Sequence, residues 1–215
     1  NHNAALNRVF DEAELQGWLV KSMRPTLLNK GVKTQSRGSF NVEEYRTIYT
    51  ALRSYHKQTT NEKSAATRET LRNYVLFLAN TGLRHGTEAL GLRWRNIEWY
   101  ERDGERYLAV NVDGKTNKRT AIARDSVENS LWRQAQLNPR IGAVDFDSLI
   151  AAKLDEPVFT TRLCETATVH NLNRAFNALL AELDLKTGAD GRTRHLFGCL
   201  YVFSFSCLNQ AFAIW

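Results

Sequence analysis

The chain has 215 residues, 43% of them hydrophobic, which is enough for a buried core and excludes disorder for most of its length. Its 29 lysines and arginines exceed its 23 aspartates and glutamates, and the net charge of +6 favours a polyanionic partner such as nucleic acid without identifying one. Cys164, Cys199 and Cys207 are too few and too scattered for a disulfide framework or a metal knuckle, and they suit a reducing cytoplasm.

The first predicted element is a helix close to the N-terminus. One of its faces carries Leu6, Val9, Phe10 and Ala13, the spacing of a helix that packs against another element. The stretch that follows, SMRPTLLNKGVKTQSRGSF, mixes proline, glycine and basic residues, and it predicts a linker between domains. That linker is either a solvated loop or a basic segment that lies along phosphates.

Two helices are predicted next, with a short connection after the second. Asn41 and Glu44 have the spacing of a capping box at the start of the first helix. Its predicted buried stripe is Tyr45, Ile48, Tyr49 and Leu52. The second helix repeats Leu71, Tyr74, Val75 and Leu78 at helical spacing. Gly82 then offers a left-handed C-cap, so Arg84 occupies a tight connection before another helix that begins near Thr87.

After residue 94 the period of the hydrophobic pattern changes from helical to alternating. Two Asp-Gly pairs, Asp103-Gly104 and Asp113-Gly114, separate alternating segments, and Leu108, Val110 and Val112 fall on one face. This pattern predicts a three-stranded antiparallel meander, with Lys115 at the tip of its second turn.

Helical periodicity returns in the last part of the chain. One predicted helix carries Val127, Leu131 and Ala135, and a later one carries Val169, Leu172, Phe176, Leu179, Leu180 and Leu183. The predicted fold class is therefore mainly α with a small three-stranded antiparallel sheet, an α+β arrangement.

The segment from Leu196 to Trp215 contains no Lys, Arg, Asp or Glu. Its length is about that of a membrane span, roughly 20 residues, but its serines, its glycine and the absence of a basic flank argue against one. A buried core segment and an abnormal end of the reading frame are the alternatives, and we favour the last.

Arg84 and Lys115 are the two residues whose chemistry suggests a site. An arginine fixed between two helices can present its planar fork of donors to phosphate oxygens. A lysine at a hairpin tip can reach into a groove as a proton donor, although lysines at such tips commonly serve only solubility.

Three segments resemble the tyrosine recombinases, the phage integrase family. Residues 81–94, TGLRHGTEALGLRW, resemble the first conserved box of that family, and residues 114–119, GKTNKR, resemble its hairpin lysine motif. The opening NHNAALNRVFDEA resembles the last helix of the preceding DNA-clamping domain. The resemblance extends over roughly residues 1–195.

The resemblance implies an integrase-like catalytic core, incomplete at its C-terminus, and a division of the chain into four parts. Residues 1–22 would end a core-binding, SAM-like helical domain, and residues 23–40 would be a basic linker. Residues 41–195 would form the N-terminal part of the catalytic domain. Residues 196–215 would be an apolar, aberrant tail.

The resemblance also implies DNA strand exchange with neither metal nor other cofactor. A tyrosine would attack the scissile phosphate and release a 5′ hydroxyl, while Arg84 holds nonbridging oxygens and Lys115 protonates the departing oxygen. In the partial second box GRTRHLFGC, Arg194 would be a further phosphate-binding arginine and His195 its histidine. The implied partner is double-stranded DNA, bound by a homo-tetramer, with no membrane involved.

The sequence departs from the family pattern in three places. The acidic residue stands four places after Arg84, at Glu88, with Thr87 in the usual position. We expect Thr87 to be a helix N-cap. Glu88 either stabilises the first helical turn through its negative charge or supports Arg84 from behind. Gly191 replaces the first residue of the second box, so Arg194 could instead belong to an ordinary basic loop. The nucleophile is not identified, because Tyr201 is too close to the second box.

Two functional hypotheses follow. The first is a tyrosine recombinase for site-specific integration, whose nucleophile is not found in this chain, and the second is an inactive DNA-binding integrase remnant. Whether the chain is an enzyme stays open at this stage. In either case a domain without its last helices would leave apolar side chains partly uncovered, among them Leu172, Phe176 and Leu183, and we expect low solubility.

Overall fold

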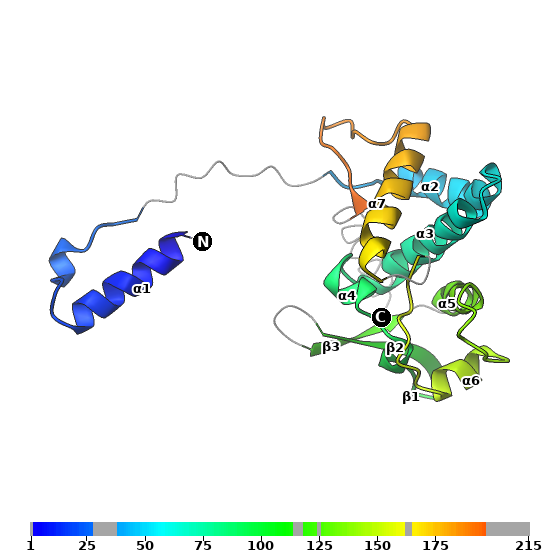
Figure 1. The fold of residues 1–215 in the computed structure, drawn as a ribbon, viewed down its shortest axis with the longest axis horizontal. Helices are drawn as coiled ribbons and strands as arrows, with labels where there is room; N and C mark the ends of the chain where they lie inside the picture. The colour runs from blue at the N-terminus through cyan, green and yellow to red at the C-terminus, as the bar shows by residue number, and fades with distance from the viewer. Residues whose placement is uncertain (1, 28–37, 114–117, 124–125, 162–164, 197–215) are drawn as a thin grey trace. The chain divides into compact units, whose positions relative to one another are not determined.

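The computed structural model describes residues 2–27, 38–113, 118–123, 126–161 and 165–196 (Figure 1). These residues fall into two compact units, Asn1–Ser36 and Arg37–Trp215. The fold is mainly helical with one small antiparallel sheet, as the sequence predicts.

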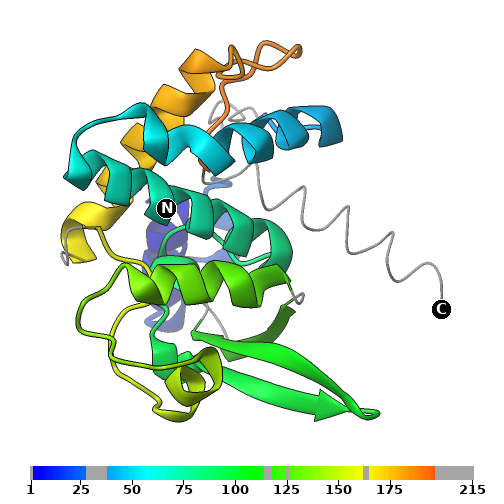
Figure 2. The same cartoon turned by 90° about the vertical axis from the view of Figure 1, so that its right-hand side faces the viewer.

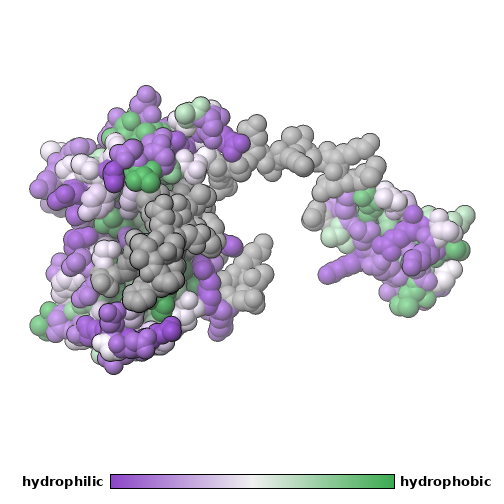
Figure 3. Space-filling view, turned by 180° about the vertical axis from the view of Figure 1, so that it is seen from behind, coloured by the Kyte–Doolittle hydropathy of each residue, from purple (hydrophilic) through white to green (hydrophobic). Residues whose placement is uncertain are grey.

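The first unit consists of helix α1 (His2–Leu15) and a short 3-10 turn, η1 (Lys21–Met23). Arg24 folds back on the helix, where its guanidinium pairs with Asp11 at 2.7 Å and Glu14 at 3.3 Å. The helix buries none of its residues, and Val9 on the predicted packing face is 61% exposed. Figure 3 accordingly shows hydrophobic side chains on the surface of this unit. The helix is confirmed, and its apolar face is open to solvent among the described residues.

The second unit contains the remaining elements. Its helices are α2 (Val42–Tyr55), η2 (His56–Gln58), α3 (Glu62–Thr81), α4 (Thr87–Leu90), η3 (Trp94–Asn96), α5 (Ser126–Gln136), α6 (Phe146–Ala151) and α7 (Glu165–Glu182). Its strands are β1 (Ile97–Arg102), β2 (Glu105–Asp113) and β3 (Lys118–Ala123), in the order β1-β2-β3. Figure 2 shows α2, α3 and α5 stacked one above another, with the sheet and α6 below them.

Helix α3 is the centre of this unit, because it contacts α2, α5 and α7. Its predicted apolar stripe is confirmed, since Leu71, Tyr74, Val75 and Leu78 are all buried. On α2 the predicted stripe is partly wrong. Tyr49 is 41% exposed, and Tyr55 is buried in its place. The buried side of α2 follows Ile48, Leu52 and Tyr55, a narrower stripe that leaves Tyr49 on its flank.

The predicted caps at the start of α2 and at the end of α3 are present. The Asn41 side chain accepts from the Glu44 backbone N–H at 2.9 Å, and the Glu44 carboxylate accepts from the Asn41 N–H at 2.9 Å. Gly82 ends α3 in the left-handed region, with φ 65°, and donates to Leu78 O at 3.1 Å. This cap turns the chain sharply, and so fixes where the Arg84 connection leaves the helix.

The meander is confirmed, and its two turns differ. Arg102 pairs with Glu105, so Asp103 and Gly104 form a two-residue turn with the positive φ values, 56° and 81°, that such a hairpin needs. At the other end Asp113 pairs with Lys118, so Asp113 belongs to strand β2 rather than to a two-residue turn. Residues 114–117, which include Lys115, lie outside the described part of the chain.

The end of the predicted linker belongs to the core of the second unit. Phe40 is 4% exposed, and its ring stands edge-on to Phe176 with centroids 6.2 Å apart. Gly38 lies so close to the start of the second box that an added Cβ would come within 3.2 Å of Arg192 Cβ and 3.3 Å of Arg194 Cγ.

The expectation of uncovered apolar side chains on α7 is wrong for Leu172 and Phe176, which are fully buried. Phe40 supplies part of the cover over Phe176, a contact that joins residues far apart in the sequence. Leu183 is half-buried and packs against the core. The surface that Figure 3 shows for this unit is mostly hydrophilic, with small and separate hydrophobic patches.

In the described ranges no helix has both the length and the apolar character that a membrane crossing needs. Leu196, the first residue of the predicted apolar tail, is buried. The rest of that tail, residues 197–215, lies outside the described residues.

Truncation of Phe40 tests its assignment to the core. We expect Phe40→Ala to lower the free energy of unfolding by about 3 to 5 kcal/mol, because it removes a buried ring and leaves a cavity against Phe176. Urea denaturation measures the change. Tyr49→Ala is the matched control, an aromatic truncation at a 41% exposed position, and it should cost well under 1 kcal/mol. Equal effects of the two substitutions would place Phe40 in a solvated linker instead.

Candidate functional site

Arg84 lies in the connection between α3 and α4, as predicted. The residues on either side of it, Leu83 and His85, are 1% and 7% exposed, whereas Arg84 itself is exposed. Gly86 follows with φ 100° and ψ −127°, a conformation that favours glycine, and directly precedes α4. The buried neighbours hold the backbone while the Arg84 side chain projects from it.

Glu88 is the residue that fixes this connection. Its carboxylate is 7% exposed, and its Oε2 atom accepts from the Arg84 backbone N–H at 3.0 Å. The same oxygen accepts from Arg119 Nη2 at 2.8 Å. The hypothesis that Glu88 supports Arg84 from behind is therefore confirmed for the backbone. Arg119 belongs to β3, so one carboxylate joins the helix connection to the hairpin.

The expected role of Thr87 is wrong. Gly86 occupies the N-cap position of α4, Thr87 is the first helical residue, and no side chain caps the helix. The residue before the helix has a positive φ, which glycine adopts freely and threonine only at a cost, so Gly86 takes the N-cap position and the helix begins one residue earlier than a Thr87 cap would predict.

The surroundings of Glu88 keep it ionised. Burial raises the pKa of its carboxyl, but the hydrogen bonds from the Arg84 N–H and from Arg119, with the positive charges of both arginines, outweigh burial and hold the pKa below the usual 4.5. At neutral pH this carboxylate is a buried anion whose charge Arg119 compensates.

The hairpin presents further polar groups beside this contact. An open pocket of about 420 Å³ is lined by residues at the end of β2 and the start of β3, with Arg119, Asn111 and Thr120 among them. The first residue of β3, Lys118, pairs with Asp113 at 3.5 Å. Lys115 lies outside the described residues, so its convergence with Arg84 stays a prediction. Arg119, four residues after Lys115 in the same motif, donates to the Glu88 carboxylate that also accepts from the Arg84 backbone N–H.

Arg194, from the second box, is in a different environment. Its side chain is 6% exposed, its Nη2 pairs with Glu44 Oε1 at 2.7 Å, and its guanidinium lies 5.0 Å from the centre of the Phe40 ring. The interpretation of an ordinary basic loop is thus wrong for Arg194, although Arg192 is exposed. His195 is also exposed. Arg194 contacts Glu44 on α2, Phe40 and the Leu185 carbonyl oxygen, whereas the Arg84 backbone N–H donates to Glu88 on α4.

Sequence reasoning missed a buried pair next to Arg84. The Tyr74 hydroxyl lies 2.6 Å from His85 Nδ1, and the Tyr74 ring also packs edge-on against Phe159, with centroids 5.0 Å apart. Burial lowers the pKa of His85 to about 4, so His85 is neutral at pH 7. Burial also raises the pKa of Tyr74, against the effect of the Gly86 backbone. Tyr74 is fully buried, which confirms that it is a core residue.

Metal ligation has no support in the described part of the chain, where no three His, Cys, Asp or Glu residues lie close enough together to hold an ion.

The Glu88–Arg119 contact predicts a pH-dependent coupling. In a double-mutant cycle with Glu88→Gln and Arg119→Ala, we expect a coupling of about 0.5 to 3 kcal/mol in unfolding free energy at pH 7. Because the folded pKa of Glu88 lies below 4.5, this stabilisation is present above pH 4.5 and is lost as the pH falls through the folded pKa. Urea denaturation across that range measures it. The exposed pair Arg102 and Asp103 is the control and should show almost no coupling. A coupling independent of pH contradicts the expectation.

His85 predicts a second pH effect. The unfolded chain protonates this histidine near pH 6.5 and the folded chain only near pH 4, so stability falls as the pH drops between these values. The loss is about 3 kcal/mol, since each pH unit in this range corresponds to about 1.4 kcal/mol. His85→Gln should remove this part of the pH dependence in urea denaturation, whereas His170→Gln, at an exposed position on α7, should leave it. A His85→Gln profile parallel to that of the wild type overturns the assignment.

In comparisons with protein-family models, with curated proteins and with solved structures, this chain matches none of them.

Proposed function

We propose that this chain binds double-stranded DNA through its phosphates, as the first part of a catalytic domain of the tyrosine recombinase type, in the cytoplasm. The observation that carries the proposal is the shared carboxylate of Glu88, which joins the Arg84 connection to the hairpin of the predicted lysine motif. The net charge of +6 supports a polyanionic partner.

The connection that carries Arg84 is suited to phosphate binding by the guanidinium. Arg84 leaves a backbone held by Glu88 and by buried neighbours, so little freedom of that backbone is lost on binding. Arg119 compensates the Glu88 charge, which reduces the repulsion between this buried carboxylate and a DNA phosphate. A guanidinium in that position can donate two parallel hydrogen bonds to nonbridging oxygens.

Strand exchange further requires a nucleophilic tyrosine, and neither the sequence pattern nor the described part of the structure assigns one, although Tyr49 and Tyr100 are exposed. Tyr55 and Tyr74 are buried in the core. The second candidate function is therefore DNA binding without catalysis, the integrase remnant. It is favoured by the pairing of Arg194 with Glu44, because that guanidinium donates to an internal carboxylate instead of projecting toward a ligand.

DNA binding at several salt concentrations tests the proposal. The wild-type chain should bind duplex DNA with an affinity that falls steeply as salt rises. Arg84→Ala should weaken binding about tenfold and reduce the salt slope by about one, because one charge-assisted phosphate contact is lost. The matched control is Arg102→Ala, an exposed arginine at the far end of the sheet, next to the first hairpin turn. The proposal fails if the two variants bind alike.

A nicked suicide substrate separates the two candidate functions. Protein that stays attached to DNA after denaturation indicates a nucleophile and strand-transfer activity. Salt-dependent binding with no covalent product indicates the inactive DNA-binding protein.

A further inference from the structure

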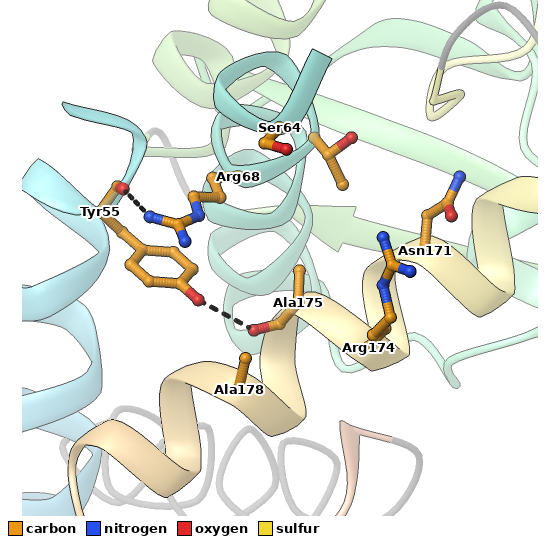
Figure 4. A pocket seen from close by; sticks show the side chains of 8 residues that line it. Tyr55, Ser64, Arg68, Asn171, Arg174, Ala175 and Ala178 are labelled. Atoms are coloured by element: carbon orange, nitrogen blue, oxygen red, sulfur yellow. Dashed lines mark hydrogen bonds between the residues drawn. The ribbon is translucent and has the colours of Figure 1, made fainter. Parts of the chain in front are cut away.

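A second basic pocket lies between α3 and α7, away from Arg84 (Figure 4). Its volume is about 150 Å³, and its polar lining consists of Tyr55, Ser64, Thr67, Arg68, Asn171 and Arg174. No lining residue is acidic. Arg68 projects from α3 and Arg174 from α7, on two sides of the pocket.

Arg68 is held in place by contacts that leave its charge uncompensated. Its Nη1 donates to the Tyr55 carbonyl oxygen at 3.0 Å, and the guanidinium lies 4.0 Å from the centre of the Tyr55 ring. The Tyr55 hydroxyl in turn donates to Ala175 O on α7 at 3.4 Å. The stacked ring and the carbonyl orient the guanidinium, and its other donors are not used by a carboxylate among the described residues.

The carboxylates near the pocket have other roles. Glu69, the neighbour of Arg68 in the sequence, pairs with Arg72 at 3.2 Å, and its Oε2 atom lies 3.0 Å from His56 Nδ1. Glu182 raises the pKa of Tyr55 in the same direction as burial, but it is exposed and does not line the pocket. Neither Arg68 nor Arg174 forms an ion pair within the described part of the chain.

We propose that this pocket binds a phosphate group. Two guanidinium groups, the Ser64 hydroxyl and the Asn171 amide line it, and these are donors that phosphate oxygens prefer. The hydroxyls of Tyr55 and Thr67 already donate to the carbonyl oxygens of Ala175 and Lys63. Ser64 lies in the first turn of α3, so the positive end of this helix adds to the attraction there. The ligand is a phosphate ester or inorganic phosphate.

The size of the pocket limits what enters it. Pockets for whole drug-sized ligands measure about 300 to 1,000 Å³, so a pocket of about 150 Å³ accepts the phosphate group and leaves the rest of its carrier outside. The carrier is either a small phosphorylated molecule or the backbone of DNA. At roughly 1.5 Å per residue, Arg68 lies about 20 Å along α3 from the end that precedes Arg84, so this pocket is a separate site.

Thermal unfolding of the full chain in sodium phosphate, against sodium chloride of equal ionic strength, tests the pocket. Phosphate should raise the melting temperature progressively with concentration, as a ligand of the folded state does. Arg174→Gln and Arg68→Gln should each weaken phosphate binding about tenfold. Arg174 is exposed, so its variant keeps the test valid if Arg68→Gln fails to fold.

Arg46→Gln is the matched control, because Arg46 is an exposed arginine on α2 that pairs only with the exposed Glu43. This variant should bind phosphate like the wild type. The proposal is overturned if phosphate stabilises the chain no more than chloride does, or if Arg174→Gln binds phosphate as tightly as Arg46→Gln.

Two further arms identify the carrier and separate this proposal from the proposed function. If Arg174→Gln weakens binding of duplex DNA as well as phosphate, the carrier is the DNA backbone, whereas unchanged DNA binding indicates a small phosphorylated ligand. Arg84→Ala should keep the phosphate-dependent stabilisation, so the two sites can fail independently. If Arg84→Ala loses that stabilisation, phosphate binds at Arg84, and the proposal that this pocket binds phosphate is overturned.

Discussion

A single carboxylate oxygen, Glu88 Oε2, is the constraint on which the candidate site depends. It accepts hydrogen bonds from the backbone of the α3–α4 connection and from a guanidinium on β3. Burying a carboxylate costs free energy unless hydrogen-bond donors and positive charge surround it. Here they come from the α3–α4 connection and from β3, the two segments that would form the phosphate site. The positions of Arg84 and Arg119 are therefore not independent, since each is set by the same anion.

Helix α3 supplies the frame in which this contact forms. The helix packs against α2, α5 and α7, and its C-terminal cap, Gly82, turns the chain into the connection that contains Arg84. Its N-terminal half carries Ser64, Thr67 and Arg68 at the second basic pocket. One long helix thus separates two groups of cationic side chains by a fixed distance, and the core around its middle makes that distance rigid.

Local features of this fold could be predicted from the sequence, whereas contacts between distant segments could not. The Asn41–Glu44 capping box, the Gly82 cap and the alternation that defines the meander are signals within a few residues, and all three are confirmed. The burial of Phe40 and the Tyr74–His85 pair depend on packing between segments whose patterns look unrelated. Glu88 shows both cases, because a role behind Arg84 was foreseeable from its position, but its partner on β3 was not.

Glu44 serves two neighbours with its two oxygens. Oε2 accepts from the Asn41 N–H at the start of α2, and Oε1 holds Arg194 in the interior. Arg194 consequently has a built-in counter-ion, and any external anion has to compete with it for the guanidinium. If an external anion bound Arg194, the partly buried Glu44 in the first turn of α2 would lose its cation. Anion binding at Arg194 is therefore thermodynamically linked to the stability of a helix start 150 residues earlier in the chain.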